Sequence, residues 1–279
     1  MKVGIDFEDI KTYIEQMNKG IEDKLFFLDK IKFNDEESYL FVDFGCADGT
    51  LISVLFEIFK ERGIHAYYIG YDISEEMINL AKTKFRFTTD SVLFTSDWRE
   101  VDEVVKRYSA MNSVLILSSV IHEVYSYANE ESDIELFWHR VLDTGFKYIC
   151  VRDMMCSADA NRATSPENHE KLNNAISFAS EMSRLRREFE NVWGPLGNNL
   201  NLVHFLLKYR WKINWQREVH ENYFPIMVDD FLHMFEGEYN LLAFERFRVP
   251  FHDECIKKDF GIELEDYTHI KAVFEKNKQ

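Results

Sequence analysis

VDFGCADG, residues 42–49, decides the fold of this chain. An apolar and aromatic run that begins at Tyr39 leads into it and ends abruptly in small residues. This is typical of a buried parallel strand that runs into a tight loop and then a helix, here residues 50–61. Gly45, Ala47 and Gly49 remove side-chain bulk where a ligand must lie against backbone. The free N–H groups at the start of the helix point toward such a ligand.

GYDIS, residues 70–74, follows at the end of a second apolar run. Asp72 stands where a carboxylate can accept hydrogen bonds from both hydroxyls of a ribose. Ser74 is expected to cap a helix over residues 75–85, because its hydroxyl can accept a free N–H. Together the two stretches predict a nucleoside site.

The glycine spacing argues against a nicotinamide or flavin site, whose fingerprint has glycines at relative positions one, three and six. Counted from Gly45, the third position is Ala47 and the sixth is Thr50. A glycine stands at the fifth position instead, as Gly49, and an acid, Asp43, lies two residues before the first glycine.

The pattern D-x-G-x-A-x-G at 43–49, followed by G-x-D-x-S-x-x-M-I-x-x-A-K at 70–82, resembles the class I S-adenosylmethionine-dependent methyltransferases. The resemblance extends over residues 38–153 and more weakly to the C-terminus. It implies that Asp43 helps to hold the methionine part of S-adenosylmethionine and that Asp72 binds the ribose. Ala47 replaces the usual middle glycine, a small-for-small change that we expect the site to tolerate. The cofactor-binding residues expected from the two stretches, besides these two acids, are Gly45, Cys46, Ala47, Gly49, Ile73 and Met77.

Three further cofactor candidates follow the third and fourth strands. Family members often place an acid beside the adenine amino group and a flat side chain against the ring, which the resemblance assigns to Asp97 and Trp98. Asp97 has an alternative role as the cap of the helix that begins near Arg99. We expect Ser118 to touch the cofactor through its backbone or its hydroxyl.

His122 and Glu123 are the catalytic candidates, because the resemblance places the end of the fourth strand closest to the transferred methyl. A histidine can remove the acceptor's proton near neutral pH, and Glu123 can orient it or accept a hydrogen bond from substrate. The alternative is that His122 only supports the loop. Tyr125 is a candidate pocket wall, and Arg152 and Asp153 are candidates for binding the acceptor at the end of the fifth strand. The remaining histidines lack metal-ligand spacing, so we expect no metal site.

Alternating strands and helices predict a doubly wound, seven-stranded, mostly parallel sheet. An antiparallel pair of strands, separated by a loop with Pro250 and Gly261, is expected to end it. The predicted strands are residues 40–44, 67–72, 92–95, 113–117, 148–152, 241–249 and 268–275. We assign residues 38–156 and 226–279 to the cofactor-binding domain, and residues 1–37 to a helical lead-in with a helix over 7–31.

Residues 157–225 form a predicted helical insertion after the fifth strand. Ser165 and Pro166 begin one helix, apolar residues recur at helical spacing over 172–189, and a second helix is predicted over 200–215. Such an insertion lies beside the carboxyl ends of the strands, where doubly wound folds bind ligands. It is a candidate cover over the acceptor, and the alternative is that its helices only widen the core.

The charge reverses within this insertion. Residues 184–217 carry seven Lys and Arg against two Glu, a local charge of +5, with aromatics among the second group of cations. Basic residues with aromatics can bind phosphates and bases of RNA, or grip a small anionic substrate, for which we single out Arg184 and Arg187. The alternative is that these cations pair with acids and cover aromatic side chains.

Composition narrows the function further. A net charge of −16 disfavours a protein that coats nucleic acid. No apolar run is long enough to span a bilayer, and the N-terminus does not have the pattern of a signal peptide. The four cysteines form no pair with metal-ligand spacing. We therefore expect a soluble, cytoplasmic protein with reduced thiols. The sequence therefore predicts a methyltransferase for a small molecule, with an anionic acceptor worth testing. An RNA or nucleotide methyltransferase and a non-catalytic S-adenosylmethionine-binding module remain alternatives, and the oligomeric state is left open.

Overall fold

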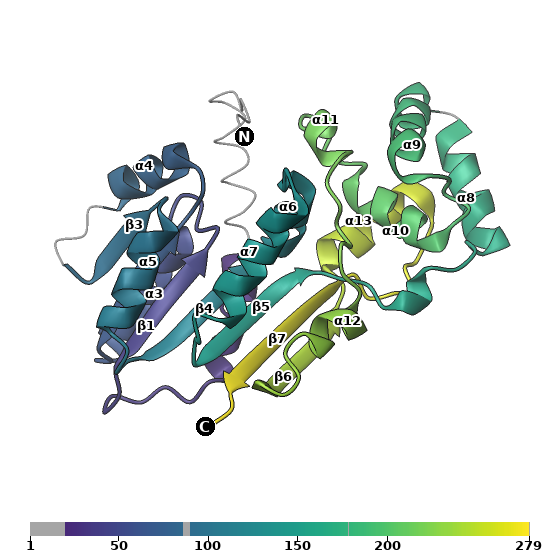
Figure 1. The fold of residues 1–279 in the computed structure, drawn as a ribbon. Helices are drawn as coiled ribbons and strands as arrows, with labels where there is room; N and C mark the ends of the chain where they lie inside the picture. Colours follow the sequence, from purple (N-terminus) through teal and green to yellow (C-terminus); the bar gives the residue numbers. More distant parts are fainter. Residues whose placement is uncertain (1–19, 86–89, 178, 279) are drawn as a thin grey trace.

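The computed structural model describes residues 20–85, 90–177 and 179–278 and contains a seven-stranded sheet (Figure 1). The strands lie in the order β3-β2-β1-β4-β5-β7-β6. The first five are parallel to their neighbours, whereas β7 is antiparallel to both β5 and β6. The strands are β1 (Tyr39–Phe44), β2 (Ala66–Tyr71), β3 (Val92–Thr95), β4 (Asn112–Ser118), β5 (Tyr148–Met154), β6 (Tyr239–Phe247) and β7 (His269–Lys276). The expected doubly wound, seven-stranded, mostly parallel sheet is confirmed.

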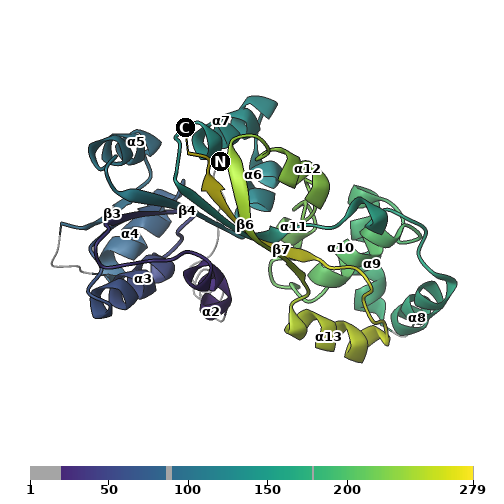
Figure 2. The same cartoon turned by 90° about the horizontal axis from the view of Figure 1, so that it is seen from below.

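Helices cover both faces of the sheet (Figure 2). Alternate residues of β1 enter different cores: Leu40 and Val42 pack on one face, and Tyr39 and Phe41 on the other. The first face carries α5 (Trp98–Arg107), α6 (Ile121–Tyr127), α7 (Glu131–Leu142) and α12 (Val228–His233). The second face carries α2 (Ile21–Lys24), α3 (Thr50–Glu61) and α4 (Glu75–Lys84). The predicted helices over 50–61 and 75–85 are therefore confirmed to within one residue.

Five helices build a further body at one end of the molecule, away from α3 and α4 in both views. They are α8 (Pro166–Ser177), α9 (Ser180–Trp193), α10 (Asn199–Lys208), α11 (Trp215–Glu218) and α13 (Pro250–Phe260). Leu172, Leu185 and Phe205 share a buried core there with Ile256 and Phe260. Residues from beyond the predicted insertion thus complete its core.

Three local predictions in this body are wrong. The apolar repeat over 172–189 belongs to two helices, since α8 ends at Ser177 and α9 begins at Ser180. The predicted helix over 200–215 ends at Lys208, and α11 is separate. The predicted loop after β6 is the helix α13, because Pro250 occupies its first turn and Gly261 ends it at φ 67°.

The lead-in lies mostly outside the described residues. From Gly20 onward the chain forms the single-turn helix α2 and then a 3₁₀ turn over Phe26–Asp29, in which Phe27 is fully buried. Within the part of the chain that is described, no helix has the length and apolar character needed to cross a bilayer.

Candidate functional site

The loop between β1 and α3 has the left-handed backbone that its small residues permit. Gly45, Ala47 and Gly49 have φ of 78°, 47° and 75°. Ala47 is unusual, because a non-glycine residue adopts this region at a cost. The amides of Gly45 and Cys46 both donate to the carbonyl of Tyr71, at 2.8 and 2.9 Å, so the loop is fastened to the end of β2.

Asp72 organises this loop, a role that the sequence did not reveal. Its Oδ2 accepts from the amide of Ala47 at 2.9 Å, and its Oδ1 accepts from the amide of Ser74 at 2.9 Å. A carboxylate has about four acceptor positions, so each oxygen keeps one for a further donor such as a ribose hydroxyl. Burial raises the pKa of Asp72, against the two amide hydrogen bonds that lower it.

A pocket lies between this loop, α2 and the end of β4. It is lined by Ile21, Lys24, Asp43, Gly45, Cys46, Ala47, Asp48, Thr50, Leu51 and Ser118. Asp43 is 3% exposed, and burial raises its pKa to about 7 in spite of the Lys24 ammonium nearby. The buried Oγ of Ser118 has no hydrogen-bond partner within the described chain. A buried orphan hydroxyl needs an explanation, and a nucleoside ligand with polar groups supplies one, so these residues fit S-adenosylmethionine.

Asp97 and Trp98 both make contacts within the protein. Asp97 accepts from the amide of Arg99 at 2.9 Å and pairs with its guanidinium at 2.6 Å, which is the capping role named as the alternative. Trp98 is 6% exposed and packs against the rings of Phe44 and Tyr71.

Ile73 follows Asp72 and is 85% exposed, so its apolar side chain is open to a ligand beside the Asp72 carboxylate. Met77, in the first turn of α4, is buried, and its amide donates to the capping hydroxyl of Ser74. The structure thus brings Asp43, Asp72 and Ser118 to one edge of the sheet, with Ile73 beside them.

His122 is held by Asp153 at the start of α6. Its Nδ1 lies 2.7 Å from Asp153 Oδ1, while Oδ2 accepts from the amides of Val120 and Ile121 at 2.9 and 2.7 Å. Burial lowers the pKa of His122, but the charge and hydrogen bond of Asp153 outweigh it and raise the value to about 9. Asp153 is fully buried, so its place is to orient α6 and His122.

Glu123 lies on the side of α6 that faces the insertion. Its Oε1 is 3.2 Å from Arg217 Nη2, and Arg217 Nε is 2.8 Å from Glu221 Oε1, so the pair ties α6 to α11. The side chain of Glu123 remains 32% exposed, yet burial raises its pKa against the pull of His122 and Arg217. Its charge also acts to raise the pKa of Lys24, against the burial that lowers it.

Two buried residues at this contact escaped the sequence reasoning. Lys208 is fully buried and donates to the carbonyls of Glu218 and Glu221, and burial lowers its pKa to about 7. Glu221 also accepts from the hydroxyl of Tyr127. Nothing in the local pattern distinguished either from a surface charge, because their partners lie on another element.

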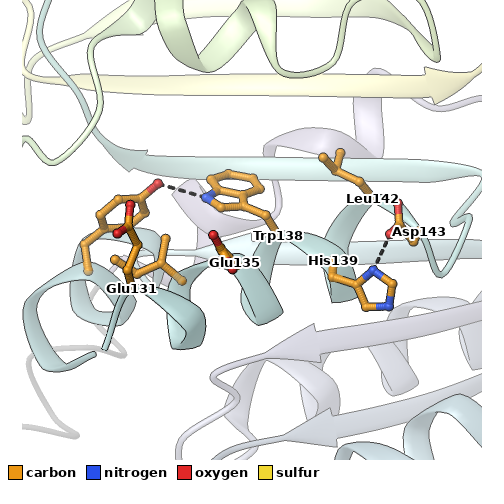
Figure 3. A pocket seen from close by; sticks show the side chains of 8 residues that line it. Glu131, Glu135, Trp138, His139, Leu142 and Asp143 are labelled. Carbon is orange, nitrogen blue, oxygen red and sulfur yellow. Dashed lines mark hydrogen bonds and ion pairs between the residues drawn. The ribbon is translucent and has the colours of Figure 1, made fainter. Parts of the chain in front are cut away.

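The proposed acceptor residues do not gather at one place. Arg152 Nε lies 2.5 Å from Asp23 Oδ2, so it fastens α2 to the end of β5. The hydroxyl of Tyr125 accepts from Trp138 Nε1 at 2.9 Å, and Tyr125 lines a groove along α7. Figure 3 shows this groove with Trp138, His139 and Leu142 along the helix. Arg184 pairs with Glu188 on α9, and Arg187 is exposed on the same helix.

Comparisons with known proteins give structures but no sequence relatives. Neither a protein-family model nor a curated protein matches the chain. An S-adenosylmethionine-dependent methyltransferase from Anabaena variabilis is 12% identical, aligns over 98% of this chain and 96% of its own, and has a TM-score of 0.48. SCL7 from Oryza sativa is 10% identical over 95% and 83%, with a TM-score of 0.49. The cyclopropane synthase MmaA2 from Mycobacterium tuberculosis is 8% identical over 99% and 87%, with a TM-score of 0.47. At such identities the likeness concerns the fold, which the strand order already establishes.

Proposed function

We propose that this protein is an S-adenosylmethionine-dependent methyltransferase that acts on a small molecule. The observation that carries the proposal is the pocket at the ends of β1 and β4, which is lined by Asp43 and by the unsatisfied hydroxyl of Ser118. Asp72 adjoins it through the amide of the pocket residue Ala47 and keeps acceptor positions unused. The residues match the chemistry of a nucleoside joined to an amino acid. Asp72 would accept from the ribose hydroxyls, and Asp43 would face the positively charged part of the ligand.

When bound, the cofactor supplies an electrophilic methyl group on a sulfonium. The protein's contribution to such a displacement is alignment, exclusion of water and removal of the acceptor's proton. The positive-φ loop positions the nucleoside, and α2 closes the pocket through the Asp23 contacts to Arg152 and Lys271.

We assign proton removal to Glu123 and give His122 a positioning role. Burial raises the pKa of Glu123, which makes its carboxylate a stronger base than an exposed one. His122 has a pKa of about 9 and is 5% exposed, so at neutral pH it is an imidazolium held on Asp153. Glu123→Gln is expected to lower turnover about 100-fold to 10,000-fold without weakening cofactor binding. Unchanged turnover would remove Glu123 from the chemistry.

A small acceptor is favoured over RNA because most cations of the insertion already pair with acids of the described chain. Arg210 pairs with Asp259, Lys212 with Glu181, and Arg217 with Glu123. This is the arrangement named above as the alternative to a nucleic-acid surface.

The test is incubation with methyl-labelled S-adenosylmethionine and fractionated cell extract, with and without ribonuclease. We expect label in a small-molecule fraction, insensitive to ribonuclease. Label that ribonuclease abolishes would support the RNA alternative. Calorimetric binding of S-adenosylhomocysteine with no labelled fraction at all would support a non-catalytic binding module.

A further inference from the structure

Helix α7 presents two parallel rows of side chains to the groove that it lines (Figure 3). Residues four apart on a helix lie one above the other, so each row follows from the spacing of the sequence. The apolar row is Ile134, Trp138 and Leu142, and the polar row is Glu131, Glu135, His139 and Asp143. The polar row runs for about 18 Å, from a helical rise of about 1.5 Å per residue. With Tyr125 of α6 the two rows enclose about 520 Å³, a surface that we call the α7 groove.

The negative charges of the α7 groove are not neutralised by the protein. Glu131 and Glu135 are exposed, and neither forms an ion pair with a residue of the described chain. Asp143 pairs with His139 of the same row, as the dashed line in Figure 3 marks. Arg140 belongs to the same helix but lies over an aromatic ring of α5, 5.4 Å from its centre. The polar row therefore keeps an excess of negative charge beside an apolar strip.

The surface around the groove adds to this charge. Residues 130–143 carry five Asp and Glu against one Arg, a local charge of −4 with His neutral. Helix α12 packs beside α7 through Phe231, whose ring lies 6.5 Å from that of Trp138, and it exposes Asp229 and Asp230. An apolar strip bordered by one sign of charge favours a partner of the opposite charge.

Two occupants from this chain itself do not match the groove. Residues 1–19 carry three lysines against four acids, so they bring no net positive charge. The basic segment of a second copy has cations that are engaged in pairs such as Arg184 with Glu188 and Arg186 with Glu190. The charge pattern therefore favours a separate, cationic partner.

We propose that the α7 groove is a docking site for a cationic amphipathic helix of a partner protein. Basic residues four apart along that helix would face the polar row, and apolar residues between them would pack on the apolar row. This is the helix-in-groove mode of recognition, in which charges set the orientation of the bound helix. The inference does not depend on the proposed function, since the α7 groove shares no lining residue with the pocket at the β1–α3 loop.

The experiment measures the binding of two labelled peptides to the full chain by fluorescence anisotropy at low salt. One peptide, about 13 residues long to span the groove, carries lysine beside leucine on every helical turn and alanine elsewhere. The other has glutamate in place of each lysine. The test variant is Glu131→Lys with Glu135→Lys, and the matched control is Glu100→Lys with Glu103→Lys, because these two acids are exposed on α5 outside the groove. Both double variants change the net charge equally, so a difference between them reports position.

A second pair of variants tests the apolar row. Ile134→Ala shortens a side chain that lines the groove, whereas Leu136→Ala alters a side chain that is 44% exposed on the same helix outside the lining. We expect Ile134→Ala to weaken binding of the lysine peptide about 3-fold to 10-fold through lost apolar contact. Leu136→Ala should leave it unchanged, and thermal unfolding of each variant checks that the fold is retained.

We expect the unaltered protein to bind the lysine peptide and not the glutamate peptide. The test variant should bind the lysine peptide about 10-fold more weakly and gain affinity for the glutamate peptide, and the control should do neither. Failure of the unaltered protein to bind the lysine peptide, or equal weakening in both double variants, would overturn the docking site. Dimerisation in sedimentation experiments that Glu131→Lys with Glu135→Lys abolishes would assign the groove to a second copy and overturn the proposal as well.

Discussion

At the scale of single residues, the two oxygens of the Asp72 carboxylate have different structural roles. One oxygen fixes Ala47 in its left-handed conformation and the other starts the turn into α4, so the loop is shaped before any ligand arrives. A preshaped loop saves the ordering cost that binding would otherwise carry.

Removing this charge tests both roles. Asp72→Asn keeps the shape of the side chain but weakens its acceptors, and we expect S-adenosylhomocysteine to bind about 1–3 kcal/mol more weakly. Glu61→Gln, at the far end of α3, is the control. Calorimetry that finds the same affinity in Asp72→Asn and the unaltered protein would contradict the ribose assignment.

The His122–Asp153 pair makes stability depend on pH. The pKa of His122 rises from 6.5 to about 9, so the pair favours the folded state fully below pH 6.5, and this contribution is lost as the pH rises through 9. The shift corresponds to about 3 kcal/mol. Urea unfolding from pH 6 to 9.5 should show this loss in the unaltered protein and not in His122→Gln. His65→Gln changes an exposed histidine and should keep the full pH dependence; parallel curves for all three proteins would refute the ion pair.

The residues of the candidate cofactor site show which placements can be predicted from sequence at this scale. Asp43 and Asp72 were predictable because each ends an apolar strand next to a small-residue turn, and the carboxyl ends of parallel strands share one edge. Asp97 met the same description, yet its carboxylate is occupied by Arg99 two residues later. The sequence pattern predicts where in the fold a residue lies. Its hydrogen-bond or ion-pair partner depends on which other side chains lie close to it in the structure.

At the scale of elements, α2 depends on contacts that lie far away in the sequence. It is a single turn, too short to be stable alone. Asp23 fastens it to β5 through Arg152 and to β7 through Lys271. The closing wall of the pocket is therefore anchored by an ion-pair cluster on the sheet.

Breaking this anchor should open the pocket. For Asp23→Asn we expect faster amide exchange over residues 20–33 and weaker binding of S-adenosylhomocysteine, because α2 loses both cationic partners. Glu22→Gln alters an exposed neighbour in the same turn and is the matched control. Unaltered exchange in Asp23→Asn would mean that apolar packing of Phe27 alone holds this segment.

The elements of the sheet were predictable to within one or two residues, because apolar runs bounded by small or polar residues leave few alternatives. Helix α13 was not, because proline and glycine also favour loops, and only the structure shows that Pro250 starts this helix and Gly261 ends it. The breaks within the insertion were missed for a related reason. Apolar spacing continued across Ser177 to Ser180, and only the packing of α8 against α9 reveals two helices.

At the scale of the whole molecule, the charge distribution argues against a polyanionic partner. The chain has a net charge of −16. Cations in the basic segment of the insertion form internal ion pairs, such as Arg184 with Glu188 and Arg210 with Asp259. Few positive charges are left to displace counterions from a phosphate backbone.

Binding to RNA should accordingly be weak and nearly independent of salt. We expect the affinity for a single-stranded oligonucleotide, measured by fluorescence anisotropy, to change less than about 10-fold between 50 and 200 mM salt, where six to ten phosphate contacts would change it at least 1,000-fold. Replacing Arg184 and Arg187 together by alanine should leave both the affinity and its dependence on salt unchanged. A steep salt dependence that this double variant reduces would restore RNA as the partner.

The position of β7 has a consequence for how the molecule is made. It pairs along its length with β5 on one side and β6 on the other, although 114 residues separate the end of β5 from its start. Until β7 has left the ribosome, β5 forms an unpaired edge of the sheet and β6 lacks its pairing partner. The apolar edge of β5 therefore stays unpaired while the 114 residues before β7 are synthesised. Premature termination before β7 would leave an exposed strand edge that favours aggregation.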